Sequence, residues 1–247
     1  MLWYRYQCYA KISRVSPRTA DPAVRTALLE NAARLTATEG AAGLTLRRLA
    51  EETGTSTMAV YTHFGGMQNL RQEVRREGFA RLRAHLELVV PTGDPVADLA
   101  RLGREYHDNA RENPHLYRAM FMEAPHTDAA RPDGDDDIGL DTFDLLVAAV
   151  RRCTQAERFS PADPVANALQ LWSAAHGVMA LLLSGLLEAE LALATLQSTW
   201  RNLFLAFGDD RARLDRSLTT ARRAVGGRAT GRPSTGRFDA RHRTAAE

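Results

Sequence analysis

The sequence predicts an all-α protein in which an N-terminal three-helix, helix-turn-helix domain precedes a larger helical domain. Apolar residues recur at helical spacing through most of the 247 residues, and no segment alternates as a strand does. A glycine turn at Gly54 separates two short helical patterns. With 45% hydrophobic and 25% charged residues, the chain can bury a core and is neither a disordered tail nor a membrane bundle. Helices are expected near 22–39, 45–53, 56–63, 67–90, 95–112, 114–123, 138–157, 163–188 and 192–207.

The charge is unevenly distributed, although the net charge is only +2. Residues 1–83 carry 13 basic and 7 acidic residues, residues 84–208 carry 9 and 18, and residues 209–247 carry 10 and 5. A basic first third beside an acidic body indicates a polyanionic partner at one end of the molecule. Cys8 and Cys153 show neither a disulfide framework nor metal-ligand spacing. We expect a cytoplasmic protein without a metal or a cofactor.

Two terminal segments are expected to lie outside the packed core. Residues 1–20 are rich in aromatic residues but have no apolar stretch like that of a signal peptide, so they are either a flexible arm or a segment upstream of the true start. Residues 209–247 are expected to form a basic, disordered tail that either adds non-specific DNA affinity or has no role. A solvated loop is expected at 125–139.

The first three helices are expected to pack around a small core. The helix at 22–39 turns Val24, Leu28, Ala32 and Leu35 inward. Thr45 can cap the next helix through its hydroxyl, and Gly54 stands where the chain must reverse. In the same way Ser56 is expected to cap the third helix. Apolar residues expected inside these two short helices are Leu46, Leu49, Ala50, Val60 and Phe64.

Arg47 and Arg48 stand in the first turn of their helix, where the macrodipole disfavours a cation by about 0.3–1 kcal/mol each. A cation at this place makes sense if an anion docks nearby, such as a DNA phosphate or the edge of a guanine. The alternative is that both are solvated surface arginines.

The following short helix exposes side chains that suit thymine methyl contacts, hydroxyl hydrogen bonds and phosphate anchoring. Tyr61 and His63 have polar tips near the helix end, although Tyr61 could instead simply pack with its hydroxyl in water. The DNA-contacting candidates are Thr45, Arg47, Arg48, Ser56, Thr57, Met58, Ala59, Tyr61, Thr62 and His63.

The segment from about 21 to 70 resembles the TetR family of bacterial transcriptional regulators. The resemblance rests on Gly43-Leu-Thr-Leu-Arg-Arg-Leu-Ala, the turn at Gly54, and Val60-Tyr-Thr-His-Phe at the right distance after it. It implies that 56–63 is the recognition helix, with Thr57, Met58 and Ala59 facing bases, Tyr61 and His63 holding phosphates, and Arg47 reaching a base or a phosphate.

One position departs from the family pattern. Met67 stands where the family often has a phosphate-binding lysine. Backbone N–H groups at that helix start can still bind phosphate. Lys11, Arg14 and Arg18 could compensate from the arm, if it is translated.

The body from 67 to 208 contains no catalytic constellation. Among the seven histidines, His126 and Asp128 form a His-x-Asp pair that lies in the expected loop. His107, His115 and His176 fall on separate helices and are read either as satisfied core residues or as ligand contacts. The alternative interpretation, an enzyme that uses the helix-turn-helix for docking, is disfavoured because the sequence shows no nucleophile–base set.

Val165 to Leu187 is the one stretch that could pass for a membrane span, because it has 23 residues without a charge. It contains several polar residues, its flanks are acidic, and its large apolar residues form a stripe of helical period. We therefore expect a buried or interface helix and no membrane partner.

An effector pocket is expected inside the body. Trp172 and His176 share a helix face, and Gly177 beside them indicates close packing of another helix or of a ligand, although a well-packed core explains the segment equally well. The segment also resembles the Trp-x-x-x-His-Gly signature of one C-terminal TetR subgroup. Pocket candidates are Tyr106, His107, Tyr117, Met120, Phe121, Phe143, Trp172, His176 and Met179.

The last two predicted helices of the body are more apolar than one buried face requires, which indicates a partner. The resemblance implies a two-fold homodimer built from them as a four-helix bundle, which would read a palindrome. Interface candidates are Leu182, Leu183, Leu186, Trp200, Leu203 and Phe207.

The expected domains are an arm at 1–20, a helix-turn-helix DNA-binding domain at 21–66, an effector-binding and dimerisation domain at 67–208, and a tail at 209–247. Together they predict a dimeric repressor that a small, mostly hydrophobic effector releases from a palindromic double-stranded DNA operator. Two alternatives stay open: control by a protein partner instead of a small ligand, and activation instead of repression.

Overall fold

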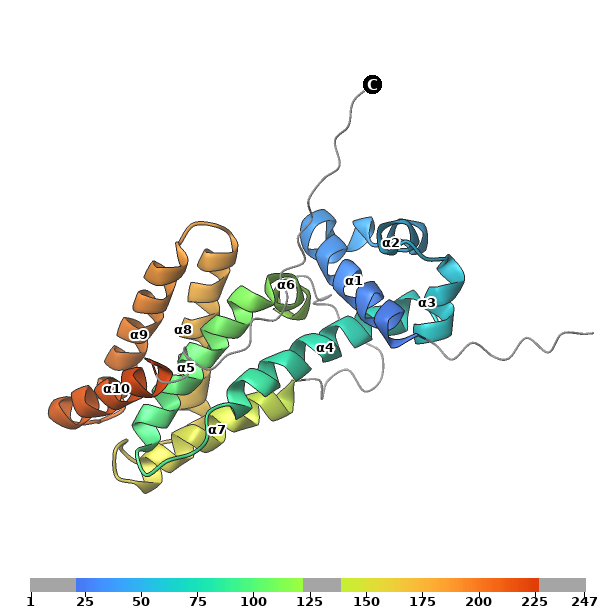
Figure 1. Cartoon of the computed structure of the whole chain (residues 1–247). Coiled ribbons are helices and arrows are strands. Elements are labelled where there is room, and N and C mark those ends of the chain that lie inside the picture. The colour runs from blue at the N-terminus through green and yellow to red at the C-terminus, as the bar shows by residue number, and fades with distance from the viewer. Residues whose placement is uncertain (1–20, 122–138, 227–247) are drawn as a thin grey trace, which may run out of the picture.

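The computed structural model describes residues 21–121 and 139–226, and in these residues it contains ten α-helices and no strand (Figure 1). The expected all-α fold is therefore confirmed. The expectations for residues 1–20, for the loop at 125–138 and for the tail beyond 226 lie outside the described residues. The helices are α1 (Pro22–Gly43), α2 (Leu46–Thr53), α3 (Thr57–Phe64), α4 (Met67–Glu87), α5 (Pro95–Glu112), α6 (Pro114–Phe121), α7 (Leu140–Gln155), α8 (Pro164–Leu183), α9 (Ala189–Ala206) and α10 (Arg211–Gly226).

The first three helices form a small domain at one end of the molecule (Figure 1). Asp21 caps α1 by accepting a hydrogen bond of 2.9 Å from the Ala23 amide. The backbone leaves the helical conformation at Gly40, where φ is +73°, so the regular helix ends where the sequence predicts. The core joins α1–α3 to the N-terminal half of α4 and to α6, through Leu28, Leu35, Leu49, Val60, Phe64, Leu70, Val74 and Leu116. The small domain therefore rests directly on two helices of the body.

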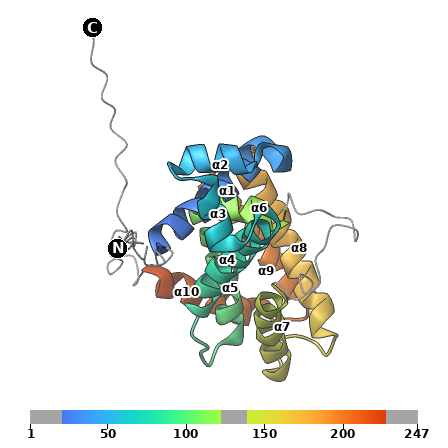
Figure 2. The ribbon, with the colours of Figure 1, turned by 90° about the vertical axis from the view of Figure 1, so that its right-hand side faces the viewer.

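The body is organised around α5, which packs against α4, α7, α8, α9 and α10. Helices α8 and α9 run side by side on one flank, as both views indicate (Figures 1 and 2). Among the described residues, only α8 is long and apolar enough to cross a membrane by length and composition. Its residues Leu171, Ala175 and Met179 are buried against the rest of the body. This placement is that of a core helix, as expected.

The C-terminal helix α10 corrects the domain boundary expected at 209. Leu214 and Ala221 are buried against the body and lie seven residues apart, on one face of the helix. The many arginines of the segment hide this apolar face in the sequence. The buried guanidinium of Arg158 donates to Asp209 at 2.7 and 2.8 Å and to Ser217 at 3.1 Å. The helical domain therefore extends to 226.

Candidate nucleic-acid interface and effector pocket

The turn between α2 and α3 has the geometry that the sequence predicts. Thr45 accepts a hydrogen bond of 3.3 Å from the Arg48 amide and so caps α2. Gly54 ends α2 in the left-handed conformation, with φ of +66°, which favours glycine. The expectation for Ser56 was wrong in one respect: it is the N-cap residue of α3, but its side chain makes no capping hydrogen bond. The Ser56 side chain is exposed at the start of the helix.

The outer face of α3 exposes apolar and hydroxyl-bearing side chains. Met58 is 67% exposed and Tyr61 51% exposed, so both side chains project from the surface of the helix. Thr57 and Thr62 are exposed beside them, and the Thr62 hydroxyl donates to the Met58 carbonyl at 3.0 Å. Val60 and Phe64, on the opposite face, are buried in the small core, so α3 is held rigidly.

Two of the DNA-contact candidates on α3 are less accessible than the others. Ala59 and His63 are half-buried. Ala59 packs against the small core, so only part of it can face a base. The His63 ring stacks at a tilt on Phe64, with 6.1 Å between the ring centroids. The accessible face of α3 is therefore centred on Thr57, Met58 and Tyr61.

The two arginines of α2 are exposed and paired with carboxylates. The side chain of Arg47 is 88% exposed and donates to Glu51 at 2.9 Å. Arg48 lies 2.9 Å from Glu52 and 3.5 Å from Glu39. Exposed pairs four residues apart on a helix contribute about 0.3–0.5 kcal/mol, so a phosphate can take the place of these carboxylates. Arg47, which has one carboxylate partner, is the more available of the two.

The start of α4 offers backbone donors in place of the lysine that is missing from the family pattern. Gly65 and Gly66 both have positive φ, +73° and +140°, and they lead directly into Met67. No side chain caps α4, so the first N–H groups of this helix are not bonded by a side chain. Such N–H groups at a helix start can bind phosphate. Lys11, Arg14 and Arg18 lie outside the described residues.

A cavity of about 450 Å³ opens in the body between α4, α5, α7 and α8. Its lining is mainly apolar and aromatic, and Arg75 is the one charged residue among the described residues that form it. Five expected pocket residues line it: Tyr106, Met120, Phe121, Phe143 and Trp172. Residues that sequence reasoning missed include Phe79, Leu82, Leu86, Leu146 and Leu169, because on an amphipathic helix they look like ordinary core positions.

Four other pocket candidates do not line this cavity. Met179 is fully buried in the core. His107 is buried, with Nε2 3.3 Å from the Ala189 carbonyl and Nδ1 3.0 Å from Asp108, so it is a satisfied core histidine. Tyr117 and His176 lie behind the wall of the cavity. The Tyr117 hydroxyl is 2.8 Å from the Tyr106 hydroxyl and 2.9 Å from Nδ1 of His176.

Burial shifts the pKa values of the groups in this hydrogen-bonded chain. It raises the pKa of both Tyr106 and Tyr117 well above the ordinary value for tyrosine. Burial also lowers the pKa of His176. The tyrosines therefore stay neutral at physiological pH and serve as hydrogen-bonding groups, and the neutral imidazole of His176 is favoured.

Helix α6 connects the cavity to the small domain. Tyr117 adjoins the cavity residue Tyr106, and the next residue, Arg118, donates to two carbonyls on other helices. One is the Ala37 carbonyl of α1, at 3.5 Å, and the other is the Leu183 carbonyl at the end of α8. Helix α6 is therefore in direct contact with both the body and α1.

Two of the predicted dimer-interface residues point into the protomer, which corrects the prediction. Trp200 is only 5% exposed, and its indole nitrogen donates to the Leu171 carbonyl at 3.0 Å. Phe207 is buried against Phe159. Leu182, Leu183 and Leu203 are half-buried, and Leu186 is 73% exposed in the turn after α8. The sequence pattern could not separate the inward stripe of α9 from its outward one, since both are apolar.

In residues 21–121 and 139–226 no group of three or more His, Cys, Asp or Glu residues could hold a metal ion.

Comparison with known families gives one match in the first domain and one in the body. A model described as "Bacterial regulatory proteins, tetR family" matches residues 28–74, and one described as "Tetracyclin repressor-like, C-terminal domain" matches residues 99–207. The HTH-type transcriptional repressor AcnR of Corynebacterium glutamicum is 45% identical over 58 residues, which are 24% of this chain and 31% of AcnR. The chain thus aligns with about a third of the length of this curated relative.

Two solved structures illustrate the shared fold. The TetR family transcriptional regulator PfmR from Thermus thermophilus matches with a TM-score of 0.61 and 22% identity, over 70% of this chain and 97% of PfmR. AibR in complex with isovaleryl coenzyme A and operator DNA matches with a TM-score of 0.58 and 20% identity, over 71% of this chain and 96% of AibR. The resemblance of 172–177 to the Trp-x-x-x-His-Gly subgroup stays a prediction.

Proposed function

Because this chain belongs to the TetR family, which consists of transcriptional regulators and not of enzymes, we propose that it is a cytoplasmic, dimeric repressor released from a palindromic operator by a small, mostly apolar ligand. The observation that carries the proposal is the exposed face of α3, on which Met58 and Tyr61 project from a rigid core beside Arg47. The similarity of a 58-residue segment to the repressor AcnR supports repression.

In the proposed complex, α3 lies in the major groove. Thr57 and Met58 contact base edges, where a hydroxyl and an apolar side chain suit thymine and adenine. Tyr61 and Arg47 bind phosphates on either side, together with the N–H groups at the start of α4. A single helix of eight residues reads few base pairs, so two half-sites about 34 Å apart supply the required affinity.

The proposed dimer forms through the outward faces of α8 and α9. These faces carry no charge along much of their length and include Gly177, Leu181 and Leu191. A Cβ atom added at Gly177 would have no neighbour within 4 Å in the protomer. This open space supports the proposal that the helix of a second copy approaches the α8 backbone there.

The proposed effector occupies the cavity between α4, α5, α7 and α8. About 450 Å³ of apolar space suits a small ligand better than control by a protein partner, which would need no such cavity. Phe121, Phe143 and Trp172 offer ring faces, and Arg75 can receive one anionic or hydrogen-bond-accepting group. The ligand-bound structure of AibR belongs to the same fold.

The proposed coupling runs from this cavity through α6 to α1. A ligand beside Tyr106 displaces Tyr117, and Arg118 on the same helix carries the displacement to the Ala37 carbonyl. The two α3 helices of a dimer then no longer fit successive major grooves. Because binding is reciprocal, the ligand weakens DNA by the same factor by which DNA weakens the ligand.

Genome-wide recovery of DNA fragments bound by the purified protein tests the proposal. Enrichment of a single palindromic sequence, bound with a steep salt dependence, is the expected result. A reporter placed behind that sequence should lose expression when the protein is present; a gain would make it an activator. Weak binding without sequence preference would contradict the proposal.

A further inference from the structure

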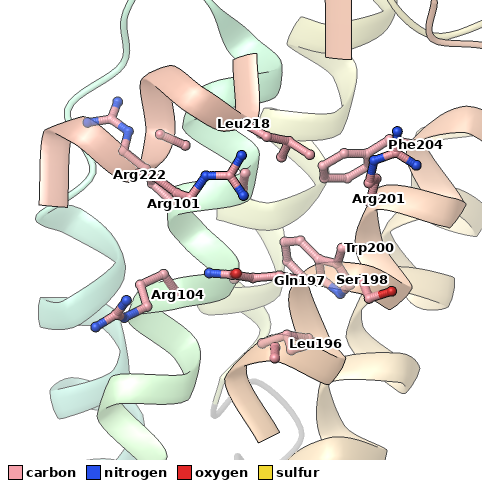
Figure 3. A pocket seen from close by; sticks show the side chains of 14 residues that line it. Arg101, Arg104, Leu196, Gln197, Ser198, Trp200, Arg201, Phe204, Leu218 and Arg222 are labelled. Carbon is pink, nitrogen blue, oxygen red and sulfur yellow. The ribbon is translucent and has the colours of Figure 1, made fainter. Parts of the chain in front are cut away.

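A second cavity lies on the other side of the body, between α5, α9 and α10 (Figure 3). Its volume is about 350 Å³, and its floor is formed by Leu196, Trp200, Phe204 and Leu218. Gly103 on α5 leaves room for the indole, because a Cβ atom there would lie 2.7 Å from the Trp200 ring. Trp200 also lines the main cavity, so its side chain is part of the wall of both.

Four arginines surround the apolar floor of this second cavity: Arg101 and Arg104 from α5, Arg201 from α9 and Arg222 from α10 (Figure 3). Among the residues that the structure describes, no acidic side chain lines it. This concentration of positive charge contrasts with the body, where residues 84–208 carry 18 acidic and 9 basic residues.

The arginines differ in how strongly neighbouring carboxylates engage them. Arg101 bonds to the buried Asp98 at 2.5 Å, and Arg104 bonds to Asp108 at 2.8 Å, so these two help to hold the body together. Arg201 lies 2.9 Å from Asp215, whose side chain is exposed. The guanidinium of Arg222 forms no ion pair or hydrogen bond with any residue in the described part of the chain. Arg201 and Arg222 are therefore the groups most available to an anion.

We propose that this cavity is a second small-molecule site, which takes an amphipathic anion: a carboxylate or phosphate on an apolar chain or ring. The anionic group binds Arg222 and Arg201, and the apolar part lies on Trp200 and Phe204. A guanidinium has five N–H donors in a fixed fork and binds both carboxylate and phosphate in a bidentate manner. Gln197 and Ser198, which also line the cavity, add uncharged donors for the same group.

This second site goes beyond the proposed function and does not depend on it, because neither α3 nor α6, on which the proposed DNA response relies, lines the second cavity. The two cavities are also expected to bind different classes of ligand. The main cavity has one arginine in an apolar lining, whereas the second has four. Since Trp200 borders both, an occupant of one cavity alters the wall of the other.

Isothermal titration calorimetry on the full-length protein, without DNA, tests the proposal with octanoate, octyl phosphate and uncharged octanol. We expect saturable binding of one or both anions and at least about tenfold weaker binding of octanol, since loss of a charge-assisted hydrogen bond reduces affinity by about that factor. The two anions distinguish a carboxylate from a phosphate site.

Variants locate the binding. Arg222→Gln and Arg201→Gln should each weaken anion binding about tenfold. Arg223→Gln, next to Arg222 but outside the cavity lining, should leave anion binding unchanged. Equal binding of octanol, no saturable binding of either anion, or indifference to both arginine variants would overturn the proposal, whatever the DNA experiments give.

Discussion

The hydroxyl of Tyr117 lies 2.9 Å from Nδ1 of His176, and this contact joins α6 to α8 behind the main cavity. The two rings are also stacked, with 5.8 Å between their centroids. Tyr117 is fully buried, and its hydroxyl contacts Tyr106 as well. The contact therefore links three helices, and each of the first two predictions removes one of its partners.

Tyr117→Phe should destabilise the protein by about 1–3 kcal/mol, because it leaves buried polar partners on Tyr106 and His176 without their hydrogen bond. Urea unfolding measures the change. Tyr61→Phe is the matched control. The Tyr61 side chain is half exposed on α3, so the loss of its hydroxyl should cost less than about 0.5 kcal/mol. Equal effects of the two variants would show that the buried contact contributes little.

Stability should fall as the pH is lowered through the range in which histidine titrates. Burial lowers the pKa of His176 in the folded chain, so the unfolded chain binds a proton there more readily. This contribution is complete above the unfolded pKa of about 6.5 and is lost as the pH falls below it. His115 contributes in the same direction, because burial and the nearby Arg118 lower its pKa. Urea midpoints at about pH 7.5 and pH 5.5 should therefore differ less in His176→Gln than in the natural protein. An unchanged difference would refute the assignment.

Arg47→Ala should weaken operator binding and reduce the slope of log K against log salt by about 1, since one phosphate contact is lost. Stability should change by less than about 0.5 kcal/mol, because the Arg47 side chain is exposed. Arg83→Ala is the control and should bind DNA normally, since Arg83 is an exposed arginine near the C-terminal end of α4 that pairs with Glu87 and Asp141. A normal salt slope in Arg47→Ala would remove this arginine from the interface.

Arg118→Gln should loosen the end of α1 without unfolding the body. The variant loses the guanidinium that donates to the Ala37 and Leu183 carbonyls. Hydrogen exchange should become faster in the C-terminal half of α1 and stay unchanged in α9. Uniform acceleration in both helices would mean that Arg118 only stabilises the whole fold and does not connect its two domains.

Gly177→Leu should weaken the proposed dimer while the protomer stays folded. The protomer has open space at this position, but a second helix packed against the glycine would meet the new side chain. Sedimentation velocity at several concentrations should show an increased fraction of monomer. Ala80→Leu, at an exposed position of α4, is the control. A dimer that is unaffected by Gly177→Leu would have to use another face.

Local signals in the sequence predicted the small domain well. Thr45 and Gly54 fix the start and the end of α2 by a hydroxyl cap and a positive φ, and both features depend on residue type alone. Ser56 is of the same type as a capping residue, yet its hydroxyl makes no such bond. Residue type therefore gave the position of α3 but not the hydrogen bond at its start.

The body was less predictable, because burial there depends on which helices meet. Trp200 and Leu191 are both apolar residues of α9, but the first is buried beneath Gly103 and the second is half exposed. Only the packing of α5 against α9 separates them. For the same reason His107 and His176 could not be distinguished, although one is a core residue and the other lies near the cavity.

The anchoring of α10 by Arg158 has a genetic consequence. A stop codon placed before Asp209 would remove the main carboxylate partner of Arg158, leaving Asp94 at 3.3 Å, and would uncover one side of α5. Removing one partner of a buried ion pair costs about 3–5 kcal/mol, which is a large fraction of the stability of about 5–15 kcal/mol of an ordinary domain. Alleles truncated there should behave as nulls, and shortened expression plasmids need to retain codon 226.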